Sequence, residues 1–197
     1  MASPRRIAGP NAKNRAVLLD AAEKLMLEEG YAAVSSRRVG AAAGLKPQLV
    51  HYYFRTMDDL FLAVFRRRAE EGSNRLAQML RSDQPLRALW AHATDARGTA
   101  LTTEFAALAN HRKEIRVEIA RYAERFREQQ AAGLSTALQR HGIDPATVPP
   151  IVLAVLLTSV SVVLVMEQAL GMSAGHVETI ALVDRYLREL EPERPSA

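Results

Sequence analysis

Cysteine is absent from all 197 residues, which excludes disulfides, thiolate metal sites and a cysteine nucleophile. Strand-type alternation is scarce, while alanine, leucine and arginine dominate, so the composition favours helices. The chain also lacks a phosphate-binding glycine loop, a nucleophile elbow and an HExxH motif, the signatures of several enzyme classes. We therefore expect an all-α protein of about nine helices that is not an enzyme and uses no cofactor.

A secretory signal is missing as well, because the first fifteen residues contain no apolar stretch. They resemble a short arm whose Arg5 and Arg6 are placed to reach a phosphate or a minor groove. Together with the absence of cysteine, this makes the cytoplasm the simplest location.

Positive charge is concentrated in the first third of the chain. Residues 1–68 contain 12 Lys and Arg against 6 Asp and Glu, and the remainder contains 14 against 16. The net charges are therefore +6 and −2, which give the overall +4. A basic N-terminal part indicates either a module that binds a polyanion or simply a solvated basic face.

Apolar periodicity and stop signals divide the chain into helices separated by short turns. Gly30 and Gly44 end two of them, Ser35 or Ser36 begins another, and Thr56 to Asp59 resembles a capping box. The expected helices are 11–29, 37–43, 45–54, about 56–80, 85–93, 102–110, 112–141, 151–166 and 177–190, with a turn at 95–99. We place a domain boundary near residue 66, with domains at 1–66 and 67–197.

The stretch from Ser36 to Arg55 has the pattern of a helix-turn-helix. Gly40, Ala43 and Gly44 allow two short helices to cross closely. Side chains at helical spacing divide into an inward and an outward set. The predicted DNA-binding residues are Ser36, Arg37, Arg38, Lys46, Pro47, Gln48, His51, Tyr52 and Arg55. The alternative is a plain three-helix core with one solvated helix.

The segment from Leu18 to Phe65 resembles the DNA-binding domain of the tetracycline-repressor (TetR) family. The resemblance is carried by LLDAAEKLMLEEGYAAVSSRRVGAAAGLKPQLVHYYFRTMDDLFLAVF, in spacing, glycines and aromatic residues. It implies a homodimeric repressor with a C-terminal ligand-binding and dimerisation domain, released from a double-stranded DNA operator by a small molecule. The chain departs from the family pattern at Arg38, His51 and Met57, where an acidic residue, a tyrosine and a lysine are usual.

Aromatic and methionine side chains recur at helical spacing in the second part of the chain. Most such residues form core, and a few orient a ligand when they line a cavity. The ligand-binding residues we predict, for an apolar effector, are Trp90, Glu104, Phe105, Asn110, His111, Tyr122, Phe126 and Met166. The spacing of His92, Glu104 and His111 does not fit a metal site.

An uncharged run extends from Ile151 to Met166. It is shorter than the roughly 20 residues that a membrane span needs and lacks flanking basic anchors. We therefore expect no membrane span, but a helix buried nearly all round, in its own subunit and against a partner. The predicted dimer residues are Val160, Val163, Leu164, Leu182 and Tyr186. The alternative is a membrane-associated or partner-binding protein that uses 151–166 as its contact surface.

Overall fold

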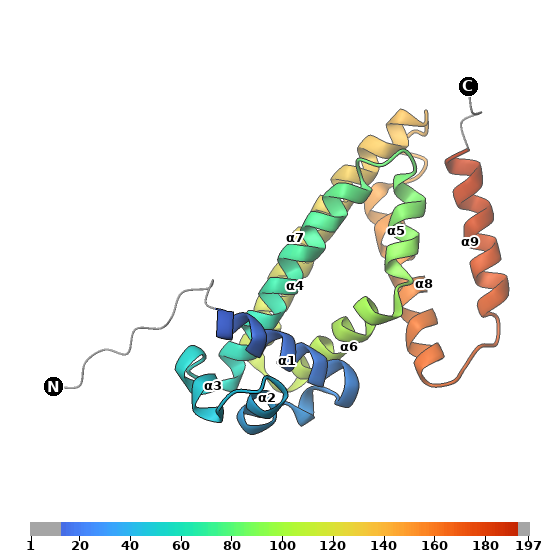
Figure 1. Cartoon of the computed structure of the whole chain (residues 1–197). Coiled ribbons are helices and arrows are strands. Elements are labelled where there is room, and N and C mark those ends of the chain that lie inside the picture. The colour runs from blue at the N-terminus through green and yellow to red at the C-terminus, as the bar shows by residue number, and fades with distance from the viewer. Residues whose placement is uncertain (1–12, 193–197) are drawn as a thin grey trace. The chain divides into compact units, whose positions relative to one another are not determined.

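The computed structural model describes residues 13–192, apart from the side chains of residues 96 and 97. The predicted arm with Arg5 and Arg6 lies outside this range. The described chain is helical and contains no strand, so the all-α prediction is confirmed. Figure 1 labels the helices in chain order, which are α1 (Lys13–Glu29), the 3-10 turn η1 (Tyr31–Ala33), α2 (Ser36–Ala42), α3 (Pro47–Tyr53), α4 (Met57–Met79), α5 (Pro85–Ala93), α6 (Ala96–His111), α7 (Lys113–Arg140), α8 (Pro150–Ala169) and α9 (His176–Leu190).

The chain forms two compact units. The first contains residues 1–70 and 101–120, and the second contains 71–100 and 121–197. Residues of α6 and the beginning of α7 thus belong to the same unit as the N-terminal helices. The functional boundary near residue 66 remains a prediction.

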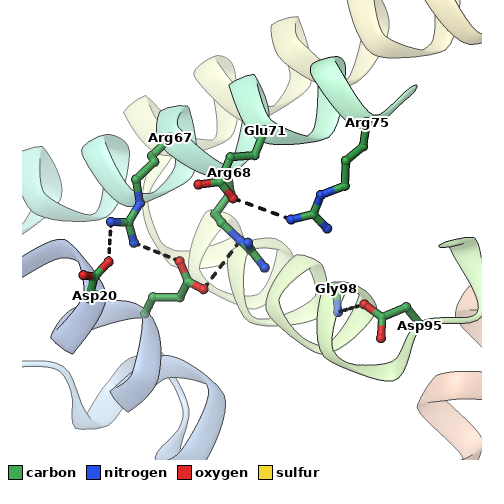
Figure 2. A network of polar contacts seen from close by, with 8 residues as sticks. Asp20, Arg67, Arg68, Glu71, Arg75, Asp95 and Gly98 are labelled. Atoms are coloured by element: carbon green, nitrogen blue, oxygen red, sulfur yellow. Dashed lines mark hydrogen bonds and ion pairs between the residues drawn. The ribbon is translucent and has the colours of Figure 1, made fainter. Parts of the chain in front are cut away.

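The core of the first unit is built from the apolar faces of α1 to α4, α6 and the first turn of α7. Leu18, Val39, Leu60 and Leu108 are completely buried. Arg67 of α4 forms ion pairs with Asp20 and Glu23 of α1 (Figure 2), the latter at 3.0 Å between Nη2 and Oε2. Buried apolar area supplies most of the stability, while these pairs fix how α1 and α4 align.

The second unit buries a separate core between α5, α7, α8 and the ends of α4 and α9. Leu76, Leu86, Leu134 and Leu138 are almost completely buried there. In Figure 1 α5 lies beside α8, and α5 also contacts α9. Gly133 permits a close approach of α7, because a Cβ at this position would lie 2.2 Å from Cδ1 of Leu80.

A buried carboxylate from the end of the chain caps α5. Glu191 is fully buried, and its Oε1 and Oε2 accept the backbone N–H groups of Leu86 and Arg87 at 2.7 and 3.1 Å. The first N–H groups of a helix have no intrahelical acceptor, and Gln84 at the N-cap forms no side-chain cap. Glu191 therefore supplies the cap from more than a hundred residues away.

One expectation about the helices was wrong, and another concerns a helix that is only partly buried. The predicted turn at 95–99 is the first turn of α6, because Asp95 accepts the Gly98 N–H at 3.2 Å and so caps the helix (Figure 2). For residues 151–166 we expected burial in the chain's own subunit and against a partner, and within the single chain α8 is buried on one side only. One side of α8 packs through Ala154, Leu157 and Ser161, and the opposite side is exposed.

Candidate nucleic-acid interface

The helix-turn-helix is fixed by a cap, a close approach and a left-handed glycine. The Ser35 hydroxyl accepts the Arg38 N–H at the start of α2. A Cβ at Gly40 would lie 3.0 Å from the Leu45 carbonyl oxygen and 3.1 Å from the backbone of Pro47. The backbone therefore passes where a side chain would otherwise be. Gly44 has φ +65°, a conformation that glycine adopts without steric cost.

Helix α3 divides cleanly into an inward and an outward face. Pro47 occupies its first turn, where its missing N–H costs nothing. Val50 and Phe54 are buried at 1% and 3% exposure. The side chains that face solvent are Lys46, Pro47, Gln48, His51 and Tyr52. The outward set is the one expected from the sequence, and it offers a cation, an amide, an imidazole and a phenol on one short helix.

Arginines flank this face, but they are not equally available. Arg37 and Arg55 are exposed, and Ser36 is half-buried. Arg38 is also exposed, yet its guanidinium donates to the Glu29 carboxylate, which raises the pKa of Arg38 above its usual value. Arg38 is therefore engaged within the chain, a contact that the sequence did not reveal because residues 29 and 38 lie on different helices.

Two further contacts steady the ends of α3. The Cζ atom of Arg15 lies 5.2 Å from the centroid of the Phe54 ring, a cation–π geometry. At the start of α4, Thr56 and Asp59 exchange hydrogen bonds of 3.0 Å between each backbone N–H and the other side chain. The predicted capping box is confirmed.

The predicted ligand-binding residues do not gather in either unit. Glu104, Phe105, Asn110 and His111 belong to the first unit, where Glu104 accepts the Tyr31 N–H. Phe105 is buried edge-on against Phe65, while Asn110 and His111 are exposed. The remaining four belong to the second unit. Among them Trp90 is buried, Tyr122 and Phe126 are half-buried and Met166 is exposed.

Burial from solvent raises the pKa of the Tyr122 phenol, and a hydrogen bond with Ser73 opposes the shift. The neutral phenol therefore persists through the physiological range. The ring of Tyr122 lies 5.8 Å from that of Phe126, so these two aromatic residues form a neighbouring pair in the second unit.

Large apolar side chains are exposed on one side of α8, on α9 and on the turn between them. Of the predicted dimer residues, Val163, Leu182 and Tyr186 are 45%, 45% and 54% exposed, Val160 is half-buried and Leu164 is buried. We call the exposed apolar residues of these elements together the α8–α9 apolar face. It consists of Ile151, Val152, Val155, Leu156, Val163, Met166, Leu170, Met172, Val177, Ile180, Leu182 and Tyr186.

A pocket of about 340 Å³ opens beside this face. At its polar edge Nε2 of His176 lies 2.8 Å from Oε2 of Glu167. It is lined by Ser159, Val160, Val163, Leu164, Glu167, Ala174, Gly175, His176 and Thr179. By length and composition alone, α8 would also be able to cross a membrane, and 28% of its most apolar window is buried.

Comparison with known proteins identifies the class. Residues 18–64 match the family described as bacterial regulatory proteins, tetR family. A solved structure described as a TetR transcription regulator, from Haloarcula marismortui, is 16% identical, with a TM-score of 0.67 over 90% of this chain and 96% of its own. None of the curated proteins compared with the chain matches it.

Two further solved structures have the same fold. A transcriptional regulator from Rhodococcus sp. Rha1 is 22% identical, with a TM-score of 0.68 over 92% of this chain and 99% of its own. The fatty acid degradation regulator FadR from Bacillus halodurans is 15% identical, with a TM-score of 0.67 over 96% and 100%. The fold and the α2–α3 unit define a helix-turn-helix DNA-binding regulator. Residues 18–64 match the tetR family of bacterial regulatory proteins, and the chain as a whole has the fold of the TetR-family regulators that it resembles.

Proposed function

We propose that the protein is a homodimeric transcriptional repressor that binds a palindromic operator and leaves it when a small molecule binds. The observation that carries this proposal is the division of α3. Val50 and Phe54 anchor the helix in the core, while Gln48, His51 and Tyr52 face solvent. A helix held in this way offers base-reading side chains to a major groove.

The exposed residues divide by chemistry into those suited to contact bases and those suited to contact phosphates. Gln48 is suited to a bidentate contact with adenine, worth about 1–3 kcal/mol of discrimination against a wrong base. Lys46, Arg37 and Arg55 are suited to phosphates, which fix register without reading sequence. His51 and Tyr52 can contact either. Arg38 contributes only when its guanidinium leaves Glu29.

The α8–α9 apolar face supports the dimer. Twelve large apolar residues are exposed on two helices and their connecting turn, and an apolar surface of this extent marks an interaction site. A second copy of the same face would cover it by two-fold symmetry. Two copies of α3 would then be held at a set spacing, as a palindromic site requires.

For the effector we propose an apolar small molecule bound in the second unit, near Trp90, Tyr122 and Phe126. Solved structures of this fold include a fatty acid degradation regulator and a multidrug binding protein, which agrees with a small-molecule signal. A regulator of this kind acts in the cytoplasm and catalyses no reaction.

Selection of DNA by the purified protein from random and genomic fragments tests this function. A selected palindrome, bound with a strong dependence on salt concentration, is the expected result. If no sequence is enriched over scrambled DNA at moderate salt, the proposal is rejected. Sedimentation of lysed cells addresses the alternative that α8 associates with membranes, since a dimer in the supernatant removes it.

A further inference from the structure

The junction between α1 and α2 begins with an unusual backbone conformation at Gly30 and continues through η1 and two extended residues. Gly30 has φ +82° and ψ 162°, a region that essentially only glycine occupies. Its own N–H donates to the Met26 carbonyl at 3.0 Å. The next N–H, that of Tyr31, points away from α1. Gly30 and Tyr31 thus begin the segment that leads from α1 into the helix-turn-helix.

A carboxylate from α6 holds the Gly30–Tyr31 turn. Oε2 of Glu104 accepts the Tyr31 N–H at 2.6 Å, across 73 residues of sequence. A hydrogen bond to an ionised acceptor is roughly twice as strong as a neutral one. A Cβ on Gly30 would lie 3.4 Å from the same oxygen, so the carboxylate also packs directly against the turn.

Glu104 itself stands on a fixed support. The neighbouring Phe105 is buried with its ring centroid 5.3 Å from that of Phe65 of α4. The end of α6 is held by Arg116, which donates to the carbonyls of residues 109 and 110 at 3.1 Å. Arg112 adds an ion pair to Asp58 at 2.8 Å. All these contacts lie within the first unit, so the carboxylate has little freedom to follow the turn if it moves.

We propose that Glu104 is a positioning residue for DNA recognition. It fixes the Gly30–Tyr31 turn and thereby the orientation of α2 and α3, although it makes no contact with DNA. From the sequence we expected Glu104 to bind a ligand, and in the structure its carboxylate accepts the Tyr31 N–H within the first unit. This inference rests on the proposed DNA-binding function.

The size of the effect follows from population arithmetic. An apparent dissociation constant rises by the inverse of the fraction of molecules in the competent arrangement. If loss of the carboxylate lowers that fraction to about a third in each subunit, operator affinity of the dimer falls by roughly ninefold. The amide oxygen of glutamine still accepts the Tyr31 N–H, so Glu104→Gln should retain most of the affinity.

The experiment compares Glu104→Ala, Glu104→Gln and Glu104→Asp, with Ala106→Ser as a control at an exposed position on the same helix. Operator affinity is measured by fluorescence anisotropy, and hydrogen exchange of the Tyr31 amide by NMR. We expect Glu104→Ala to bind about tenfold more weakly with fast Tyr31 exchange, and Glu104→Gln to stay within threefold of wild type with slow exchange. The control variant should match wild type.

Any other result of this experiment contradicts one step of the proposal for Glu104. If Tyr31 exchanges fast in Glu104→Ala while operator affinity is unchanged, the Gly30–Tyr31 turn does not position α2 and α3 for DNA binding. Equal losses in the alanine and glutamine variants would overturn the acceptor role. If Glu104→Ala does not fold, Glu104→Asp serves in its place, because its shorter side chain withdraws the acceptor. If the wild-type protein binds no operator, the proposed function is rejected. The hydrogen-exchange data still report on the hydrogen bond between Glu104 and the Tyr31 N–H.

Discussion

Replacing Gln48 and Tyr52 together by alanine tests the recognition surface most directly. Both side chains face solvent on α3, so the folded chain loses little. The principal cost to stability is the edge contact between the Tyr52 and Tyr53 rings, whose centroids lie 5.1 Å apart. Such a pair contributes about 0.5–1.5 kcal/mol. The free energy of unfolding should therefore fall by about 1 kcal/mol, and the circular dichroism spectrum should stay helical.

The loss in operator binding is larger. A bidentate glutamine–adenine contact discriminates by about 1–3 kcal/mol, and a dimer makes it twice. Loss of Gln48 alone thus removes about 2–6 kcal/mol, which corresponds to a weakening of the operator complex by roughly 30-fold to more than 10⁴-fold. Removal of Tyr52 adds to this, so the double variant should bind the operator no better than scrambled DNA.

The assay is anisotropy titration of operator and scrambled duplexes at several salt concentrations. Both removed side chains are uncharged, so affinity for scrambled DNA and its salt dependence should remain unchanged. Gln129→Ala, at an exposed glutamine of α7, is the matched control. Lys46→Ala should instead weaken both duplexes and reduce the salt slope by about 0.9 for each phosphate that the lysine neutralises. Operator affinity retained within threefold by the double variant would mean that another element reads the sequence.

Three further perturbations test interactions within the protein. Glu29→Gln should release Arg38 for a phosphate and raise DNA affinity severalfold with a steeper salt slope; weaker binding would contradict competition between the carboxylate and DNA. Val163→Arg should yield a folded monomer in analytical ultracentrifugation, because the arginine would lie in the α8–α9 apolar face; a stable dimer would place the interface elsewhere. Glu191→Ala should lower the free energy of unfolding by about 3 kcal/mol in urea titration, since it leaves two N–H groups of α5 without an acceptor; a change below about 0.5 kcal/mol would refute the capping role.

These three variants need matched controls. Gln139→Ala, at an exposed position of α7, serves the stability measurement. Val163 is preferred over Val160 for the dimer test, because Val160 packs against the core of the second unit and its replacement would confound dimerisation with folding. Unfolding is measured at several protein concentrations, since dimerisation makes apparent stability depend on concentration.

Much of the helix-turn-helix domain could be predicted from contacts between residues that are close in the sequence. Gly30 and Gly44 both adopt positive φ, and Thr56 forms the expected capping box with Asp59. Helical periodicity by itself separates the inward Val50 from the outward Gln48. These features depend on residues within one or two turns of each other, where backbone sterics and side-chain reach leave few alternatives.

Parts of the second unit were harder to predict, for reasons that differ between its elements. Asp95 was taken for a turn residue, although it caps α6. The run at 151–166 was expected to be buried in its own subunit and against a partner, but hydrophobicity does not show which side of the helix packs within the chain. Buried and exposed residues of α8 are similarly apolar, so no pattern in the sequence distinguishes its two sides.

By itself the sequence determined the helices, their principal stop signals and the outward side chains of α3, because these follow from spacing and from the conformational freedom of single residues. Only the tertiary structure decided which partner each of three carboxylates binds. Glu29 binds Arg38, Glu104 holds the turn at Tyr31, and Glu191 caps α5. Each carboxylate lies beside its partner because whole helices pack together, and no periodic pattern in the sequence predicts that packing.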